Sequence, residues 1–458
     1  MSLGGRVAVA AIATIALAAA APASGAVSEG VFTVKGAPAP GPDRFDQVLV
    51  HRFGPRSAKR VLVLMPGTQG GAGDFTIDGR WLASHVKGLQ VWAIDRRTYA
   101  LEDTSIFEQG LAGRRSPQEV FDYYLGWITG ATPPSHYNFV DTSQLGFTRE
   151  WGMKVALDDA RRVVKLAREG GRRVILGGHS LGASLTVAYA AWDFNGRPGY
   201  KDLDGLVLID GGLLGSFDAY DLAQAREQIT ALQSASPFLD LLGTGIPEAA
   251  GLFAEVGGLF AKLDPTGDGS ILQNYPLLPP DFKPAVPATN RAILGYAFDR
   301  DSSPPSLGLL HVNAGGLAES GTPRDWVDGG VTPVANLADT FAQEPTNAVE
   351  WFFPTRLTID TNGADQMRMN DVGRFLGLRL EHTRQVDLPL YAFQTDLADA
   401  HVLDGARAFV KRSATSRGEA VLVNRDPQTS HLDPLTAAPP ANDFLRTVKP
   451  FLAGAFGR

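Results

Sequence analysis

The sequence predicts an α/β fold in which helices cover both faces of a mostly parallel central sheet. Short apolar runs bounded by Gly, Pro or Asp alternate along the chain with longer segments of helical periodicity. The chain has 458 residues, 44% hydrophobic and 20% charged, which is ordinary globular composition and enough for one large domain with insertions. Strands that alternate with helices favour parallel pairing through right-handed crossovers.

The expected strands are continuous apolar runs, as buried parallel strands are. These runs cover 60–65, 89–94, 173–176, 206–209, 388–393 and 420–423. A further short strand candidate, at 47–50, precedes them. Helices are expected at 153–169, where Ala and Val recur at helical spacing before Gly170-Gly171, and at about 181–192.

The alternation of strands and helices is lost in the middle of the chain. Between 216 and 385 the sequence mixes amphipathic helical pieces, such as 221–234 and 247–263, with Pro-rich loops. We therefore expect a large, mainly helical cap or lid insertion at 216–385, which divides a core of 60–215 and 386–458. The apolar helix 247–263 either acts as a lid over the site or packs the insertion onto the core. We expect residues 27–59 to form an N-terminal extension.

Residues 1–26 have the pattern of a secretory signal peptide. Arg6 precedes an apolar run from Val7 to Ala20, and small residues follow it up to Ala26. The alternative is a membrane anchor, but the run is rich in Ala and shorter than the roughly 20 strongly apolar residues of a spanning helix. We expect an extracellular or periplasmic protein with no stable membrane insertion after cleavage.

Composition excludes several classes of function. The formal net charge of −7 and the lack of a basic run argue against a nucleic-acid partner. With no Cys, the chain has no cysteine nucleophile and no thiolate metal site. It has no phosphate-binding Gly-rich loop between a strand and a helix and no His-Glu-x-x-His motif, so we expect no cofactor and no catalytic metal.

The segment Gly178-His179-Ser180-Leu181-Gly182 carries the clearest chemical signal. It joins an expected strand to an expected helix, and a serine at such a sharp turn is exposed at the carboxyl edge of the sheet. The flanking glycines leave room for the neighbouring backbone. The sequence therefore predicts that Ser180 is a nucleophile.

On this motif the chain resembles the α/β-hydrolase superfamily, and most closely its lipases and esterases. The resemblance covers roughly 60–215 and 386–458, and it implies the chain order serine, acid, histidine. His431, in the loop after the last strand, is the expected base, and His401 is its main rival. Strand alternation is expected to point His179 away from the cleft.

The resemblance places the acid after the strand at 388–393, which favours Asp396. Asp210, at the end of the strand 206–209, ranks second and Asp399 third. For the oxyanion it implies the backbone N–H of Leu181 and a second N–H from the loop 66–71, which we expect to be that of Thr68, with Gln69 next. Pro66 stands where this family's loop usually has His.

The resemblance implies hydrolysis of a small-molecule, lipid or polymer ester through a Ser-His-Asp triad and an acyl-enzyme. An amidase or peptidase with the same triad, or a binding protein on the hydrolase scaffold, are the alternatives. Epoxide hydrolases and dehalogenases of this fold carry Asp where Ser180 stands, so these activities are disfavoured.

Overall fold

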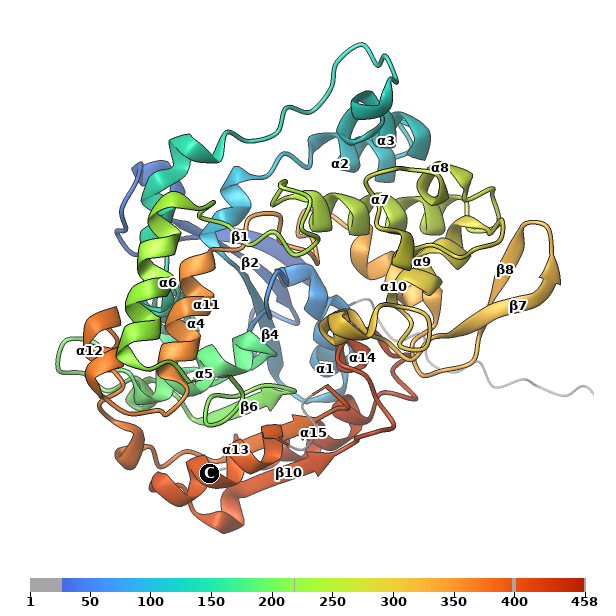
Figure 1. Ribbon diagram of the computed structural model, residues 1–458. Coiled ribbons are helices and arrows are strands. Elements are labelled where there is room, and N and C mark those ends of the chain that lie inside the picture. The colour runs from blue at the N-terminus through green and yellow to red at the C-terminus, as the bar shows by residue number, and fades with distance from the viewer. Residues whose placement is uncertain (1–26, 218, 398–400, 457–458) are drawn as a thin grey trace, which may run out of the picture.

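A computed structural model describes residues 27–217, 219–397 and 401–456, and it is built on an eight-stranded sheet (Figure 1). The strand order is β1-β2-β4-β3-β5-β6-β9-β10. Strand β2 runs antiparallel to β1 and β4, and the other neighbouring pairs are parallel. This confirms the predicted fold class. The strands are β1 (Glu29–Lys35), β2 (Gln47–Phe53), β3 (Arg60–Met65), β4 (Leu89–Asp95), β5 (Arg173–His179), β6 (Gly205–Ile209), β9 (Leu390–Gln394) and β10 (Ala420–Asn424).

The segment 27–59, expected to be an extension, belongs to the sheet. Strand β1 pairs with β2, and β2 pairs with β4, the third strand in the order of the sheet. Only one residue of β1, Val34, is buried, because β1 lies at the edge of the sheet. An edge strand lacks the continuous apolar run that identifies a buried one.

Two layers of helices cover the sheet. Helices α4 (Met153–Arg168) and α5 (Leu181–Ala191) pack on one face, where their apolar side chains join those of β3, β5 and β6 in a single buried cluster. Helices α1 (Thr76–His85) and α15 (Asp443–Ala455) cover the other face. This is the double-sided burial that mostly parallel sheets require.

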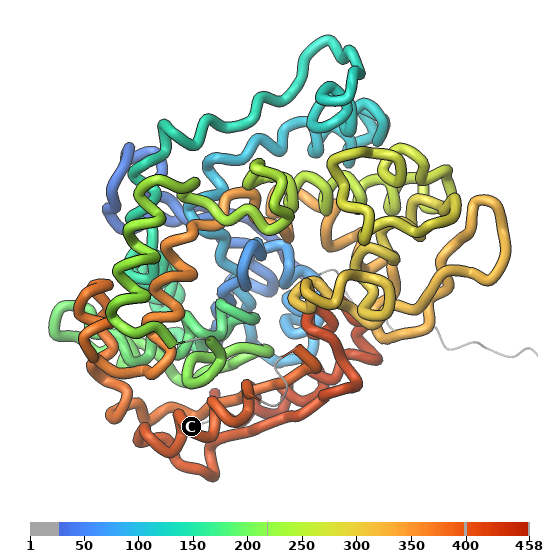
Figure 2. The backbone as a smooth tube through the Cα atoms, viewed as in Figure 1, coloured from blue at the N-terminus to red at the C-terminus, as the bar shows by residue number. Residues whose placement is uncertain are grey.

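A second body of helices stands beside the sheet and has its own apolar core. In Figures 1 and 2 the segments around 105–124 lie next to the yellow segments around 250–340, although they are far apart in the sequence. This body contains α2 (Ser105–Leu111), α3 (Pro117–Tyr124), α7 (Ala249–Leu263), α8 (Ser270–Gln273), α9 (Asn290–Phe298) and α10 (Val334–Phe341), with the hairpin β7 (Gly315–Gly321) and β8 (Arg324–Asp328).

The packing therefore divides the chain differently from the expected boundaries at 216 and 385. Helices α6 (Leu222–Ser234) and α11 (Thr355–Ala364), both inside that span, contribute buried residues to the cluster on the face of the sheet. Helix α12 (Asp371–Leu376) packs with them. Conversely, 105–124 was assigned to the core and packs in the second body.

Within the described ranges, none of the helices combines the length and the apolarity needed to cross a membrane. The expected signal peptide at 1–26 and the candidate acid Asp399 lie outside the described residues.

Candidate active site

Ser180 stands at the turn between β5 and α5, at the carboxyl edge of the sheet. Its backbone is left-handed, with φ 53° and ψ −123°, a conformation that non-glycine residues rarely adopt. Its own N–H donates to the carbonyl of Ile209 on the neighbouring strand at 2.8 Å, which helps to hold the turn. Strain of this kind persists only where the surroundings fix it.

The glycines around the turn are required by close backbone contacts. A Cβ on Gly178 would lie 2.3 Å from the carbonyl carbon of Gly182, and one on Gly182 would lie 2.0 Å from the oxygen of Met65. A Cβ on Gly67 would lie 3.0 Å from the Cβ of Ser180. The loop after β3 therefore passes directly against the serine.

His431 lies in the loop between β10 and α14 (Asp433–Thr436), as the sequence predicted. Its Nδ1 is 2.6 Å from Oδ2 of Asp210, and both side chains are almost completely buried. A carboxylate only accepts hydrogen bonds, so the proton of the neutral ring is on Nδ1. The Nε2 atom is then left with a free lone pair, which is the form a general base requires.

Asp210 is held as a carboxylate by the groups around it. Burial acts to raise the pKa of Asp210, but the hydrogen bond and charge of His431, together with hydrogen bonds from Thr395, bring it below its usual value. The N–H of Thr395 donates to Oδ1 at 2.8 Å, and the Thr395 hydroxyl donates to Oδ2. A charged acid beside His431 stabilises the imidazolium that forms when the ring takes a proton.

In the structure His431 pairs with Asp210, which the sequence analysis ranked second, and not with Asp396. Asp396, which was placed first, does not pair with His431; its carboxylate accepts from the hydroxyl of Ser430 at 2.9 Å and from Arg300 at 3.4 Å. Strands β6 and β9 are neighbours, so both aspartates reach the same edge of the sheet. The side chain of Asp210, directly after β6, reaches the ring, whereas that of Asp396 contacts the side chains of Ser430 and Arg300.

His401, the rival base, is exposed at the start of α13 (His401–Arg412). Among the described residues, Asp210 pairs with His431 and Thr395 instead.

His179 departs from its predicted orientation. Its buried ring lies 4.4 Å from that of His431, and its Nε2–H donates to the His431 carbonyl at 2.9 Å. Burial, then the neighbouring His431, lowers the pKa of His179 to about 3, so the ring is neutral. Alternation distinguishes the two faces of a strand, but His179 is the last residue of β5, where a side chain can reach over the sheet edge.

Within the described part of the chain, backbone N–H groups without a protein acceptor occur next to Ser180 in the chain and in the loop after β3 that lines the same cavity. Leu181 is the first residue of α5, so its N–H has no acceptor within the helix. In the loop after β3, the N–H groups of Thr68 and Gln69 have no protein acceptor among the residues that the structure describes. All three residues are at or beside the cavity that contains Ser180.

A cavity of about 280 Å³ is lined by both Ser180 and His431. Most of its wall is apolar and comes from the second body of helices. Leu432 and the loop residues Thr68 and Gln69 complete the wall near the serine. The apolar wall includes Phe253, Leu272, Leu294, Phe298, Leu310 and Phe341.

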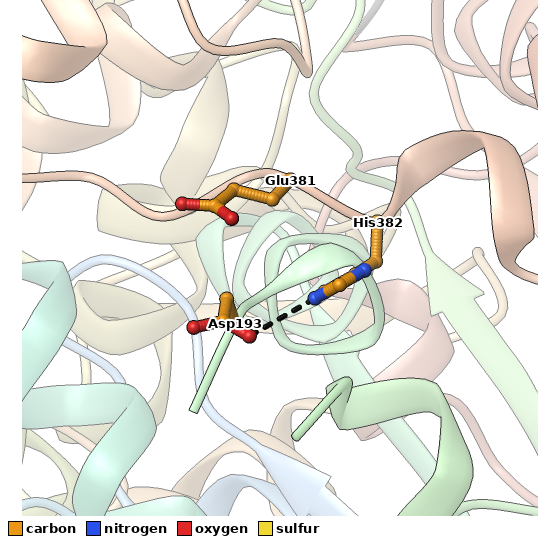
Figure 3. Close-up of side chains that lie close together, drawn as sticks. All are labelled: Asp193, Glu381 and His382. Carbon is orange, nitrogen blue, oxygen red and sulfur yellow. Dashed lines mark hydrogen bonds and ion pairs between the residues drawn. The ribbon is translucent and has the colours of Figure 1, made fainter. Parts of the chain in front are cut away.

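Another group of polar side chains lies at the end of α5, outside this cavity. Figure 3 shows Asp193, Glu381 and His382, whose potential metal-ligating atoms lie within 4.8 Å of one another. His382 Nε2 is 3.0 Å from Asp193 Oδ1, and backbone hydrogen bonds join the same two segments. The pair of Asp193 and His382 links the end of α5 to the segment at 379–382, and we assign it no catalytic role.

No family model matches the sequence, and no curated protein is similar to it. Among solved structures, a candidate lipase from Sulfolobus solfataricus is 14% identical, with 93% of this chain and 94% of that chain covered at a TM-score of 0.51. An epoxide hydrolase from an endophytic Streptomyces is 12% identical, with 94% and 97% covered at a TM-score of 0.45. A bacterial brefeldin A esterase is 13% identical, with 98% and 81% covered at 0.41. The first of these similarities shows a shared fold.

Proposed function

We propose that this chain, which has the α/β-hydrolase fold, is a serine hydrolase that cleaves carboxylic esters. The observation that carries the proposal is the buried pair of His431 and Asp210, beside the same cavity as a serine on a strained turn. A hydroxyl is a weak nucleophile until an adjacent base takes its proton. Nothing in a purely structural role requires these features to meet at one cavity.

In the proposed reaction Ser180 attacks the ester carbonyl while Nε2 of His431 takes its proton. The oxyanion is bound by the N–H groups of Leu181 and Thr68, and Gln69 offers the alternative second donor. His431 then protonates the leaving alcohol and activates the water that releases the acid. Asp210 holds the ring in the required tautomer throughout.

The cavity wall supports an apolar acyl group as the part of the substrate that is buried. An apolar chain placed against Phe253, Leu294 and Phe341 loses contact with water, at a gain of about 0.8 kcal/mol for each methylene. Polar groups near the reacting carbonyl would meet the loop residues Thr68 and Gln69.

A panel of p-nitrophenyl esters and anilides, assayed with the Ser180→Ala variant as control, tests this function. We expect ester hydrolysis that falls by several orders of magnitude in the variant, because the triad acts as a unit. Cleavage of anilides with inert esters would replace the esterase proposal by an amidase. Equal activity of the variant and the wild type would remove the serine mechanism.

We also propose export through a signal peptide at 1–26, on the pattern of that segment. N-terminal sequencing of the mature protein tests this: a start near residue 27 is expected, and an intact N-terminus in a membrane fraction would contradict it.

A further inference from the structure

Arg96 makes an unusual set of contacts beneath the loop that faces Ser180. It follows β4, and its guanidinium donates to the carbonyls of Pro66 at 2.6 Å, Gly67 at 2.7 Å and Gly70 at 3.1 Å. Its charge is paired with Glu350 at 2.5 Å, and only 10% of its side chain is exposed. A single buried side chain therefore holds three carbonyls of one five-residue loop.

These contacts determine the direction of the peptide groups in the loop. The carbonyls of Pro66, Gly67 and Gly70 all turn toward Arg96, and the carbonyl of Gln69 accepts from the N–H of Glu350 at 2.8 Å. Gln69 has a left-handed backbone, with φ 51°, which costs energy for a residue with a side chain. The N–H groups of Thr68 and Gln69 are left without a protein acceptor among the described residues, beside Ser180.

The segment 347–350, which belongs to the central part of the chain, supports the same loop. Gly70 forms a bridge with Val349, and the N–H of Gly71 donates to the carbonyl of Ala348 at 2.8 Å. Glu350 also accepts from the hydroxyl of Thr98, so its carboxylate is fixed between Arg96 and that hydroxyl. The loop is thus held between Arg96 on one side and 347–350 on another.

We infer that Arg96 is a positioning residue that, together with Glu350, holds the oxyanion-binding loop in its active geometry. This inference rests on the proposed function. A donor stabilises the oxyanion only when it is already aimed at the place where charge develops. The planar guanidinium can bind several carbonyls at once because its donors have fixed directions, which the single ammonium of lysine does not offer. The central part of the chain therefore contributes to catalysis as well as to the walls of the cavity.

The test compares Arg96→Lys with Arg97→Lys. Lysine at 96 keeps the positive charge beside Glu350 but cannot hold three carbonyls in one geometry. Arg97 is the matched control: its side chain is even less exposed than that of Arg96, and its partners are Asp46, Asp159 and the carbonyl of Ala37, away from the loop.

Two measurements are made on each purified, folded variant. The first is hydrogen–deuterium exchange of the peptide that covers 66–75, and the second is kcat and KM on the best ester. For Arg96→Lys we expect exchange of this peptide to rise at least tenfold and kcat to fall 10- to 100-fold with KM within threefold of wild type. For Arg97→Lys we expect neither change.

Glu350→Gln provides a second variant if Arg96→Lys does not fold. It removes the charge partner but leaves the backbone bond to Gln69, so we expect the same two changes at a smaller size. Wild-type exchange and wild-type kcat in Arg96→Lys, or in the Glu350 variant where that is the one that folds, would overturn the inference. Faster exchange in a protein whose wild type has no ester hydrolysis would support the role of Arg96 in the loop while contradicting the proposed function.

Discussion

Replacement of Asp210 by Asn is the substitution that best separates the two candidate acids. The carboxylate accepts the N–H of Thr395 on Oδ1 and both His431 and the Thr395 hydroxyl on Oδ2. An Asn at this position keeps an acceptor for the Thr395 N–H and then presents its NH₂ group to Nδ1 of His431. The ring must accept there, so its proton moves to Nε2, where it cannot take the proton of Ser180.

The expected loss follows from this change of tautomer. In a serine protease the corresponding substitution lowers kcat about 10⁴-fold, which is about 5.5 kcal/mol at about 1.36 kcal/mol for each factor of ten. We expect Asp210→Asn to lower kcat on a p-nitrophenyl ester by a similar factor. The fold should be retained, because the side chain has the same shape, and circular dichroism checks this.

Asp396→Asn is the matched control. Its contacts with Ser430 and Arg300 are partly exposed, and such pairs contribute at most about 1 kcal/mol, so we expect kcat within about tenfold of wild type. A large loss in Asp396→Asn with near-normal kcat in Asp210→Asn would refute the assignment of the acid.

Three further outcomes follow from other parts of the structure. His179→Ala removes a donor to the His431 carbonyl and should lower kcat about fivefold, since a buried hydrogen bond contributes about 1 kcal/mol. Because the pKa of His179 is about 3, the pH profile of kcat/KM above pH 5 should keep its shape. A Cβ on Gly257 would lie 3.5 Å from Leu294 and 3.9 Å from Leu272, which is ordinary contact, so Gly257→Ala should raise the free energy of unfolding by about 0.5–1 kcal/mol. Gly257 also lines the cavity, so the larger side chain in Gly257→Leu should fill it and reduce hydrolysis of dodecanoate esters much more than that of acetate esters. Burial, then the charge of Glu350, raises the pKa of Asp95 to about 8. The contribution of this carboxyl group to stability is therefore complete below about pH 4, where it is protonated in both the folded and the unfolded protein, and is lost as pH rises to 8. Thermal unfolding from pH 5 to 8 should show a shallower fall of Tm in Asp95→Asn than in wild type.

Each of these has a clear contrary result. A changed pH profile in His179→Ala would mean that this ring titrates in the working range. Equal losses on short and long esters in Gly257→Leu would mean that the acyl chain does not lie against α7. The same pH dependence of Tm in Asp95→Asn and wild type would mean that Asp95 is ionised in the folded protein.

Much of the sheet could be predicted because its central strands are continuous apolar runs, such as Val61–Met65. The sharp turn at Ser180 could be predicted because its glycine-flanked motif directly follows such a run and precedes a helix. Strand β1 could not, since at the sheet edge only Val34 is buried. The position of His431, in the loop after the last strand, could also be predicted from the sequence.

The choice of acid could not be made from the sequence. Asp210 and Asp396 both follow strands, β6 and β9, that are neighbours in the sheet, so spacing along the chain does not distinguish them. What decides is the direction of each side chain at the sheet edge, which depends on contacts with Thr395 and Ser430. The left-handed backbone of Asp210, with φ 47°, is one such local feature that sequence does not reveal.

The contacts of Arg96 are also invisible in the sequence. They join β4, the loop at 66–70 and Glu350, which is 254 residues away along the chain. Only the folded arrangement brings these segments together. A buried arginine directly after a strand, by itself, indicates an ion pair and nothing more specific.

The central claim is that Ser180 is an activated nucleophile, and covalent labelling tests it most directly. The intact protein is treated with a fluorophosphonate, digested, and examined by mass spectrometry, beside Ser180→Ala and Asp210→Asn. We expect one adduct on the peptide that contains Ser180, no adduct in Ser180→Ala, and much slower labelling in Asp210→Asn. An unmodified Ser180 in folded wild-type protein, or an adduct that persists in Ser180→Ala, would contradict the claim.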